Sequence, residues 1–166
     1  MWGSHDDAAF ALACKYPKLR LIVQELPKVA ANSKVEAGLN GEFMAHDFFK
    51  SSLSRMLTFT STVVSSINWS DPYCLKILKA LAPALKQGSR VLVMDVVMPP
   101  PCVLPYSIER KSRAMDVTML EVYNAKERVL NESKSLFEQA NPESAFQGMQ
   151  QPPGSNLAIL EVAWEG

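Results

Sequence analysis

Acidic side chains lie at the ends of two segments that are expected to be buried strands. Glu25 comes near the end of a mostly apolar run at residues 19–26, and Asp95 follows the apolar residues 91–94. Ligands of open α/β sheets bind outside the carboxyl ends of the strands, which is where these two carboxylates are expected. The alternative for Glu25 is an ordinary solvated residue at a strand end.

A third acidic residue, Glu127, lies between Lys126 and Arg128. Two free carboxylates beside a cleft, here Asp95 and Glu127, are able to act as the acid and the base of a reaction. The competing interpretation is that Glu127 caps a helix or forms a salt bridge with one of its basic neighbours.

Sequence motifs for nucleophilic or metal-dependent chemistry are absent. The three cysteines, Cys14, Cys74 and Cys102, are odd in number and far apart, so we expect buried free thiols, with no disulfide framework and no metal site. Cys74 comes one turn into an expected helix, where the helix dipole lowers the pKa of an exposed thiol; a buried, inert Cys74 is the alternative. No Ser/His/Asp arrangement or phosphate-binding loop is present.

Composition narrows the class of protein. The chain has 166 residues, 48% of them hydrophobic, and 17 Lys plus Arg balance 17 Asp plus Glu. This balance argues against a nucleic-acid partner and against compositional disorder. No apolar run is long enough for a membrane span, and no signal peptide is recognisable, so we expect no membrane association and a cytoplasmic protein.

Helices and strands alternate along the chain. A Pro at the first helical position opens the clearest helix at Asp71, and Gly88 is expected to end it, with Pro83 tightening its last turn. We predict an α/β, three-layer sandwich with a mostly parallel sheet and an antiparallel C-terminal hairpin. The other expected elements are a helix from 4 to about 15, strands at 19–26, 42–46, 59–66 and 89–97, helices at 108–123 and 131–140, and hairpin strands at 146–150 and 156–164 around a turn at 152–155.

Several blocks of the sequence are similar to a known family. These blocks are residues 21–27, 46–49, 68–71 with 74 and 77–78, and 152–155 through 161–166. On these blocks the chain resembles the catalytic domain of fungal and plant small-molecule O-methyltransferases, which implies a Rossmann-like sheet with a reversed last strand and S-adenosylmethionine as cofactor. In the family a separate N-terminal helical domain forms the dimer.

The resemblance assigns roles to particular residues. It implies that Glu25 binds the ribose hydroxyls of the cofactor and that Asp47 and Phe48 flank its adenine. The alternative for Phe48 is simple packing in the core. It also implies a substrate pocket lined by residues of the 108–123 helix, for which a core stripe is the alternative. These residues are Met115, Asp116 and Met119.

The sequence departs from the family at the cofactor turn. Family members reach the cofactor through a strand and a glycine-rich turn, whereas this chain begins inside that turn, keeping Gly3 but having Trp2 and Asp6 where other glycines lie. We therefore expect residues 1–166 to be a single truncated catalytic domain that lacks the first strand of the sheet and the dimerisation domain. An unpaired strand inside a sheet favours a homo- or hetero-oligomer, and the altered turn brings S-adenosylmethionine binding into question.

The second departure is at the catalytic base. Family members have a histidine that takes a proton from the substrate hydroxyl, and Ile67 occupies this position here. Asp95 and Glu127 match the two acids that orient that histidine. Isoleucine cannot accept a proton, so the usual base chemistry is not expected.

Three functions follow from the match and its departures. The first is a degenerate O-methyltransferase of secondary metabolism that acts as a pseudoenzyme or accessory subunit. The second is a non-methylating cyclase or pericyclase acting on a polyketide-like small molecule. The third is a fragment of an S-adenosylmethionine-dependent O-methyltransferase. The expected partner is a small-molecule substrate or another protein.

Overall fold

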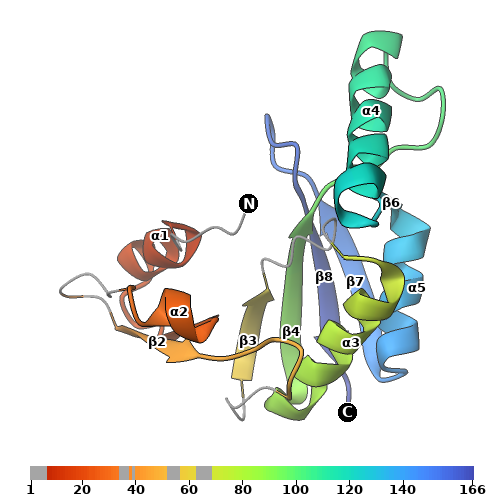
Figure 1. Cartoon of the computed structure of the whole chain (residues 1–166). Helices are drawn as coiled ribbons and strands as arrows, with labels where there is room; N and C mark the ends of the chain where they lie inside the picture. Colours follow the sequence, from red (N-terminus) through yellow and green to blue (C-terminus); the bar gives the residue numbers. More distant parts are fainter. Residues whose placement is uncertain (1–6, 34–37, 39, 52–56, 63–68) are drawn as a thin grey trace. The chain divides into compact units, whose positions relative to one another are not determined.

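The computed structural model divides into two compact units, residues 1–53 and residues 54–166 (Figure 1). It describes residues 7–33, 38, 40–51, 57–62 and 69–166. Each unit contains its own strands, and the elements that carry the expected site residues belong to both.

The first unit is built on a pair of parallel strands. β1 and β2 are paired from Leu21 opposite Gly41 to Glu25 opposite Ala45. The predicted strands are confirmed, but Pro27 opens a short helix where the sequence suggested only a strand end, because Pro suits the first turn of a helix. The elements of this unit are α1 (Asp7–Lys15), β1 (Leu21–Glu25), α2 (Pro27–Ala30) and β2 (Gly41–Ala45).

The main sheet of the second unit is mixed. Its strands lie in the order β3-β4-β8-β7, with β3 parallel to β4 and with β8 antiparallel to both β4 and β7. The predicted antiparallel C-terminal hairpin is confirmed. The expectation of a mostly parallel sheet is wrong for this sheet, because β8 pairs antiparallel with β4 as well as with β7. The strands are β3 (Leu57–Thr62), β4 (Leu85–Asp95), β7 (Ser144–Gln150) and β8 (Ala158–Trp164).

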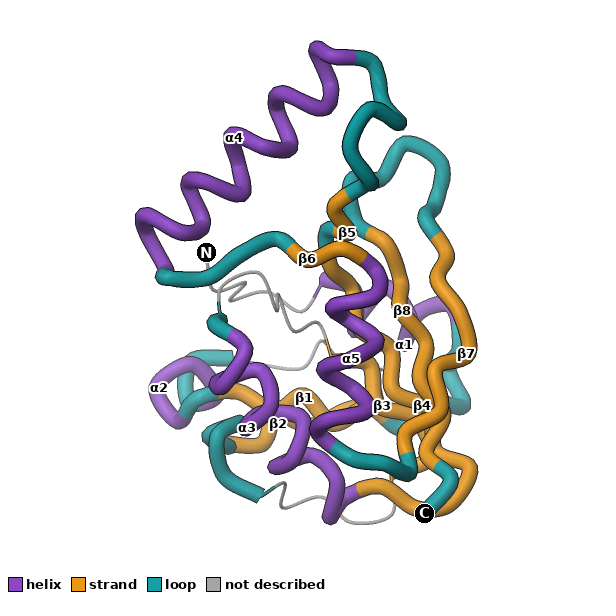
Figure 2. The backbone as a smooth tube through the Cα atoms, turned by 90° about the vertical axis from the view of Figure 1, so that its right-hand side faces the viewer, coloured by secondary structure: helices purple, strands orange, loops and turns teal. Residues whose placement is uncertain are grey.

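Helices α3 (Asp71–Leu81) and α5 (Leu130–Ala140) lie side by side against this sheet (Figure 2). Alternate residues of β4 and β8 are buried, as expected for strands with one face toward a helical layer. The core residues are Val91, Val93, Phe137, Leu160 and Val162. The further helical layer of the predicted sandwich stays a prediction.

The boundary between α3 and β4 differs from the prediction. The helix begins at Asp71 as expected but ends at Leu81, and a 3-10 helix, η2 (Ala82–Ala84), leads directly into β4. Pro83 lacks a backbone N–H and so cannot continue the α-helical hydrogen bonds. Gly88, expected to end the helix, lies instead within the strand, with a φ of 80°.

A long helix separates two very short strands in the second unit. α4 (Tyr106–Tyr123) has no buried residue, and it lies between β5 (Val97–Met98) and β6 (Arg128–Val129). These two strands pair in parallel, Val97 with Arg128 and Met98 with Val129. Neither short strand was predicted, since two residues are too few to give a periodic pattern.

Candidate functional site

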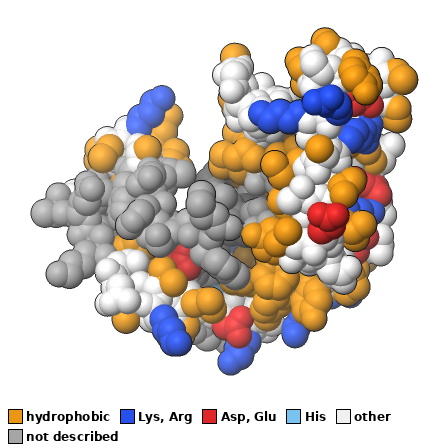
Figure 3. All heavy atoms as spheres, turned by 45° about the horizontal axis from the view of Figure 1, so that its top comes forward, with side chains coloured by type: hydrophobic (Ala, Val, Ile, Leu, Met, Phe, Trp, Pro, Cys, Tyr) orange, Lys and Arg blue, Asp and Glu red, His pale blue; other side chains and the backbone are white. Residues whose placement is uncertain are grey.

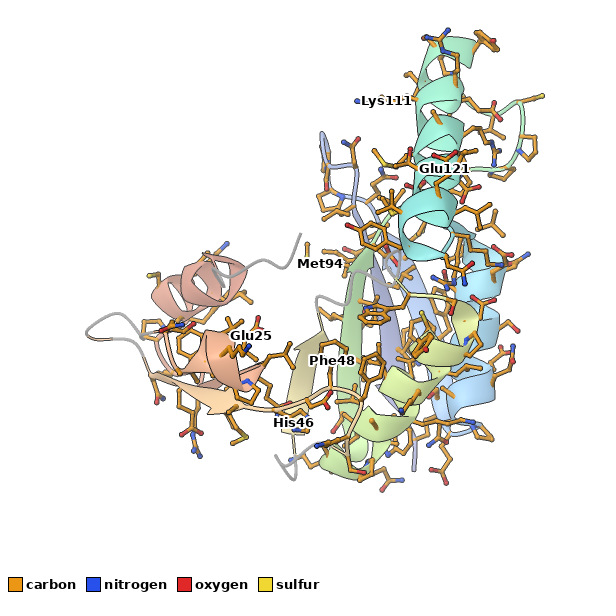
Figure 4. The ribbon with its side chains drawn as sticks, in the orientation of Figure 1. Glu25, His46, Phe48, Met94, Lys111 and Glu121 are labelled. Carbon is orange, nitrogen blue, oxygen red and sulfur yellow. The ribbon has the colours of Figure 1, made fainter. Side chains whose placement is uncertain are left out.

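In the first unit, the expected cofactor residues lie at one edge of the β1–β2 pair. The two strands are parallel, so Glu25 and Ala45 end at the same edge. The backbone N–H of His46 donates to the Glu25 carbonyl oxygen at 2.7 Å and extends the pairing by one residue. Asp47 and Phe48 follow at once in the chain, so three of the four residues predicted to bind the cofactor lie at or directly after the carboxyl ends of β1 and β2. Glu25 and Phe48 are labelled in Figure 4.

A turn fixes the backbone of Asp47. Its Oδ1 accepts a hydrogen bond from the Phe49 N–H at 3.1 Å, and its carbonyl accepts one from the Lys50 N–H at 2.8 Å. The Phe48 ring lies 4.8 Å from that of Phe49, tilted by 47°. Carboxylates accept hydrogen bonds from hydroxyl and amino groups, and an aromatic ring stacks on a base. These acceptors and the aromatic ring fit the adenosine part of S-adenosylmethionine. The predicted Gly3 lies outside the described residues.

In the second unit, backbone pairing brings Asp95 and Glu127 into the same region. Asp95 ends β4, is 4% exposed, and accepts a hydrogen bond at Oδ1 from the Val96 N–H at 2.8 Å. Two residues later, Val97 pairs with Arg128, the residue that follows Glu127. The parallel register therefore sets the segment of Glu127 alongside the chain that leaves Asp95.

Glu127 is buried and incompletely bonded. Its side chain is 6% exposed, and Oε2 has no hydrogen-bond partner. Its backbone N–H donates to Oδ1 of Asp116 at 2.8 Å. Burial raises the pKa of the Glu127 carboxyl above its ordinary value, and the negative charge of Asp116 raises it further.

The basic neighbours of Glu127 form their ion pairs elsewhere. Arg128, 2% exposed, donates from Nε and Nη2 to Oδ1 of Asp71 at 2.9 and 2.7 Å, and from Nη2 to the Trp69 carbonyl at 2.8 Å. Lys126 Nζ lies 2.6 Å from Oε1 of Glu132 and 3.7 Å from Oδ2 of Asp71. The alternative that Glu127 forms a salt bridge with a neighbour is therefore wrong.

The predicted pocket residues of α4 are only partly covered. Met115 is 44% exposed, whereas Asp116 and Met119 are half-buried. The alternative of a buried core stripe is wrong for this helix, which has no buried residue. Asp116 has a definite contact, because it accepts the Glu127 N–H.

One of the three thiols is buried and two are exposed. Cys74 is buried, its Sγ donates to the Trp69 carbonyl at 3.3 Å, and burial is the main cause that raises its pKa. Cys14 and Cys102 are exposed, which contradicts the expectation of buried thiols. Among the described residues, no group of three or more His, Cys, Asp or Glu side chains is arranged to hold a metal ion.

One feature of the site was not predicted from the sequence, and one predicted residue lies outside the described part of the chain. The ion pair of Arg128 with Asp71 was not predicted, because 57 residues separate the partners; an arginine directly before an apolar segment was its only signal. Ile67, at the expected base position, lies outside the described residues. No described helix is long and apolar enough to cross a membrane.

Comparison with known sequences gives one consistent result. Residues 3–141 match the family model described as "O-methyltransferase domain". The chain is 38% identical over 163 residues to O-methyltransferase gsfB of Penicillium aethiopicum, covering 98% of this chain and 39% of that protein. It is also 38% identical over 169 residues to O-methyltransferase pyvH of Aspergillus violaceofuscus, covering 99% of this chain and 39% of the relative. The chain thus spans about two fifths of the length of these curated relatives.

Comparison with solved structures supports the fold. The structure described as "Crystal structure of TnmH" has a TM-score of 0.83 at 19% identity, covering 95% of this chain and 46% of that one. The LepI complex with SAM has a TM-score of 0.80 at 24% identity, covering 95% and 40%. At these identities the likeness establishes an α/β methyltransferase-like fold.

Proposed function

Because the chain belongs to the O-methyltransferase domain family, we propose that it takes part in methyl transfer to a hydroxyl group of a small molecule of fungal secondary metabolism. The observation that carries the proposal is the buried Glu127 carboxyl, whose Oε2 has no hydrogen-bond partner. A buried polar atom without a partner costs free energy of folding, so such atoms concentrate at sites that bind ligands.

The proposed methyl donor is S-adenosylmethionine, which supplies an electrophilic methyl group when bound. Glu25 and Asp47 would accept hydrogen bonds from its hydroxyl and amino groups, and Phe48 would pack on the adenine. Support comes from their common position at the edge of β1–β2. A structure of the same fold, OxaC, is described in complex with SAH and oxaline.

The proposed role of Glu127 is to accept a hydrogen bond from the substrate hydroxyl; Asp95 ends β4, two residues before the Val97 that pairs with Arg128. Ile67 cannot accept a proton, so we expect slow turnover. The expectation of a pseudoenzyme or accessory subunit is the limiting case in which turnover is zero.

The test combines binding with turnover. Calorimetry with S-adenosylmethionine is expected to show binding, and incubation with hydroxylated aromatic compounds is expected to give products heavier by one methylene. The E127Q variant is expected to lower turnover about 100-fold, the low end of general-base contributions. The matched variant E121Q changes an exposed acid of α4 and is expected to leave turnover unchanged. Binding without any methylated product would refute methyl transfer, and absence of binding would point to the accessory role.

A second candidate is a cyclase or pericyclase that does not transfer methyl groups. Ile67 in place of a proton acceptor favours it, because such reactions depend on pocket shape and substrate orientation. A structure of this fold, at a TM-score of 0.79, is described as a pericyclic reaction enzyme. Its signature would be an isomeric product of unchanged mass from a late pathway intermediate.

The oligomeric partner is also a proposal. We propose that the chain functions with a second copy or with another protein, since α4 exposes large apolar side chains such as Leu120 and Val122. Light scattering of the purified chain is expected to give a mass above that of one copy. A monodisperse monomer that turns over substrate would contradict this.

A further inference from the structure

The end of α4 folds the chain back onto the helix. Asn124 adopts a left-handed conformation with φ of 51°, which Asn tolerates better than most residues, and ends the helix. The N–H of the next residue, Ala125, donates to the Met119 carbonyl at 3.3 Å. This reversal returns Glu127 to Asp116, eleven residues earlier, where the carboxylate Oδ1 accepts the Glu127 N–H at 2.8 Å.

Among the described residues, the Glu127 side chain lacks the cation that normally pairs with a buried carboxylate, and one of its oxygens lacks a hydrogen bond. It is 6% exposed, Oε2 has no partner, and the neighbouring cations Lys126 and Arg128 pair with Asp71 and Glu132. The contact that Glu127 makes with Asp116 is through its backbone, so Oε2 keeps its capacity to accept a hydrogen bond.

We infer that Asp116 is a positioning residue that makes Glu127 the proton acceptor for the ligand hydroxyl. Asp116 holds the backbone of Glu127 and sets a negative charge beside its carboxyl. In the step itself, the O–H bond of the ligand breaks, its electron pair stays on the ligand oxygen, and the proton bonds to Oε2 of Glu127; the proton later leaves to water. This inference rests on the proposed function for the identity of the ligand but not for the properties of Glu127.

The charges around Glu127 favour proton uptake. Asp116 faces it from α4, Asp95 ends the adjacent β4, and the cations on either side in its own segment are occupied by other carboxylates. Burial and the Asp116 charge both raise the pKa of the Glu127 carboxyl. A more basic carboxylate is a better proton acceptor near neutral pH, because its pKa lies closer to the working pH.

A merely structural Asp116 would predict a different response. If its only task were to accept the Glu127 N–H, then a neutral residue that also accepts this bond would leave the titration of Glu127 unchanged. The amide oxygen of D116N keeps an acceptor at this place while removing the charge, and D116S removes the charge with an acceptor on a shorter side chain. If one of the two variants fails to fold, the other still allows the titration to be measured; circular dichroism shows whether each variant is folded.

The experiment is a carboxyl NMR titration of the whole chain labelled at glutamate, without cofactor or substrate, with the Glu127 signal assigned by its loss in E127Q. In the unsubstituted protein Glu127 is expected to titrate above the ordinary range, and D116N and D116S are expected to move the titration to lower pH. E121Q, an exposed acid on the same helix (Figure 4), is expected to leave it in place. An unchanged titration in D116N and D116S would overturn the inference.

A second measurement tests the proton step. If methyl transfer is observed, the acidic limb of its pH–rate profile is expected to move to lower pH in D116N, following the NMR titration. A titration that moves while the acidic limb stays in place would overturn Glu127 as the proton acceptor. Because the NMR titration needs no ligand, failure of methyl transfer would refute the proposed function without changing the result for Asp116.

Discussion

Glu127 and Glu132 are close in the chain but have opposite electrostatic surroundings. Burial raises the pKa of the Glu127 carboxyl, with the charge of Asp116 as a second cause. The hydrogen bond from Lys126 lowers the pKa of the Glu132 carboxyl, and the Val129 N–H, 3.1 Å from Oε2, acts in the same direction. Because one pKa is raised and the other is lowered, Glu127 and Glu132 should change the free energy of unfolding with pH in opposite directions, and both effects can be tested in one protein.

Replacing Glu127 by Gln should stabilise the protein at neutral pH. Since the folded pKa of Glu127 is raised, its contribution to stability is present below the unfolded value, about 4.5, and is lost as pH rises through the folded value. The free energy of unfolding of E127Q relative to the unsubstituted protein should therefore increase from pH 4 to pH 7. Urea unfolding at several pH values measures this difference.

E132Q is the matched control with the opposite sign. The folded pKa of Glu132 is lowered, so its contribution is present above about 4.5 and is lost as pH falls through the folded value. E132Q should be less stable than the unsubstituted protein at pH 7, with the difference disappearing in acid. The same sign for both variants would contradict the assigned environments.

Arg128 should be the most costly polar residue to remove. R128A would delete hydrogen bonds to Asp71 and to the Trp69 carbonyl from a side chain that is 2% exposed. Breaking a buried pair costs about 3 to 5 kcal/mol, and we expect the lower end because the Asp71 side chain is 46% exposed and regains water. Removing the exposed Arg90, which pairs with Glu161, should cost at most about 1 kcal/mol. Equal losses in chemical denaturation would contradict this view.

The hydrogen-bond partners and neighbouring charges of an individual residue were the hardest features to predict from the sequence. Strand ends and the family resemblance predicted Glu25, Asp47 and Phe48, and the structure places them at or just after the ends of β1 and β2; their binding roles stay predictions. The lack of a partner for Glu127 could not be predicted, because it depends on where Lys126 and Arg128 place their charges. Both basic side chains form ion pairs with Asp71, which is more than fifty residues away in the sequence, and hydrophobic periodicity does not reveal such long-range pairs.

At the scale of elements, α4 differs from the other long helices of its unit. α3 and α5 bury residues in the core, while α4 buries none and exposes apolar side chains beside Lys and Arg (Figure 3). Its contacts are polar: Arg113 donates to Glu109 and to the Pro99 carbonyl, each at 3.1 Å, and Asp116 accepts the Glu127 N–H.

Leucine substitutions should distinguish the two kinds of element. Leu160 on β8 is 1% exposed and belongs to the core, so L160A should cost about 2 to 5 kcal/mol in chemical denaturation. Leu120 on α4 is 59% exposed, so L120A should change the stability of the isolated chain by about 0.5 kcal/mol or less. A cost for L120A as large as that for L160A would show that α4 is covered in solution.

Element boundaries followed local signals where these were strong. Asp71-Pro72 marked the start of α3, and the turn around Gly154 marked the hairpin, where Gly154 has a φ of 77°. The end of α3 was misplaced because the leucine spacing continues past Pro83, and the missing N–H of proline outweighs that spacing. The antiparallel hairpin was predicted, but the strand order β3-β4-β8-β7 could not be, since it depends on long-range pairing.

At the scale of the whole molecule, the two units have separate sets of internal contacts. Because cooperativity follows contact density, we expect calorimetry of the chain to show two unfolding transitions, with the more stable one belonging to residues 54–166. L160A should lower the melting temperature of that transition alone. A single transition shifted as a whole by L160A would show that the units unfold together.

The short β5–β6 ladder has an evolutionary consequence. Two pairs of residues in β5 and β6 hold the chain after Asp95 next to the chain after Glu127. The segment that contains α4 connects Met98 to Arg128. The closure entropy of such an excursion changes slowly with its length. Insertions and deletions in the segment between Met98 and Asp116 should therefore be tolerated without breaking the pairing of Val97 with Arg128 and of Met98 with Val129. This segment can then diverge between homologues while the backbone next to Asp95 and Glu127 stays in register.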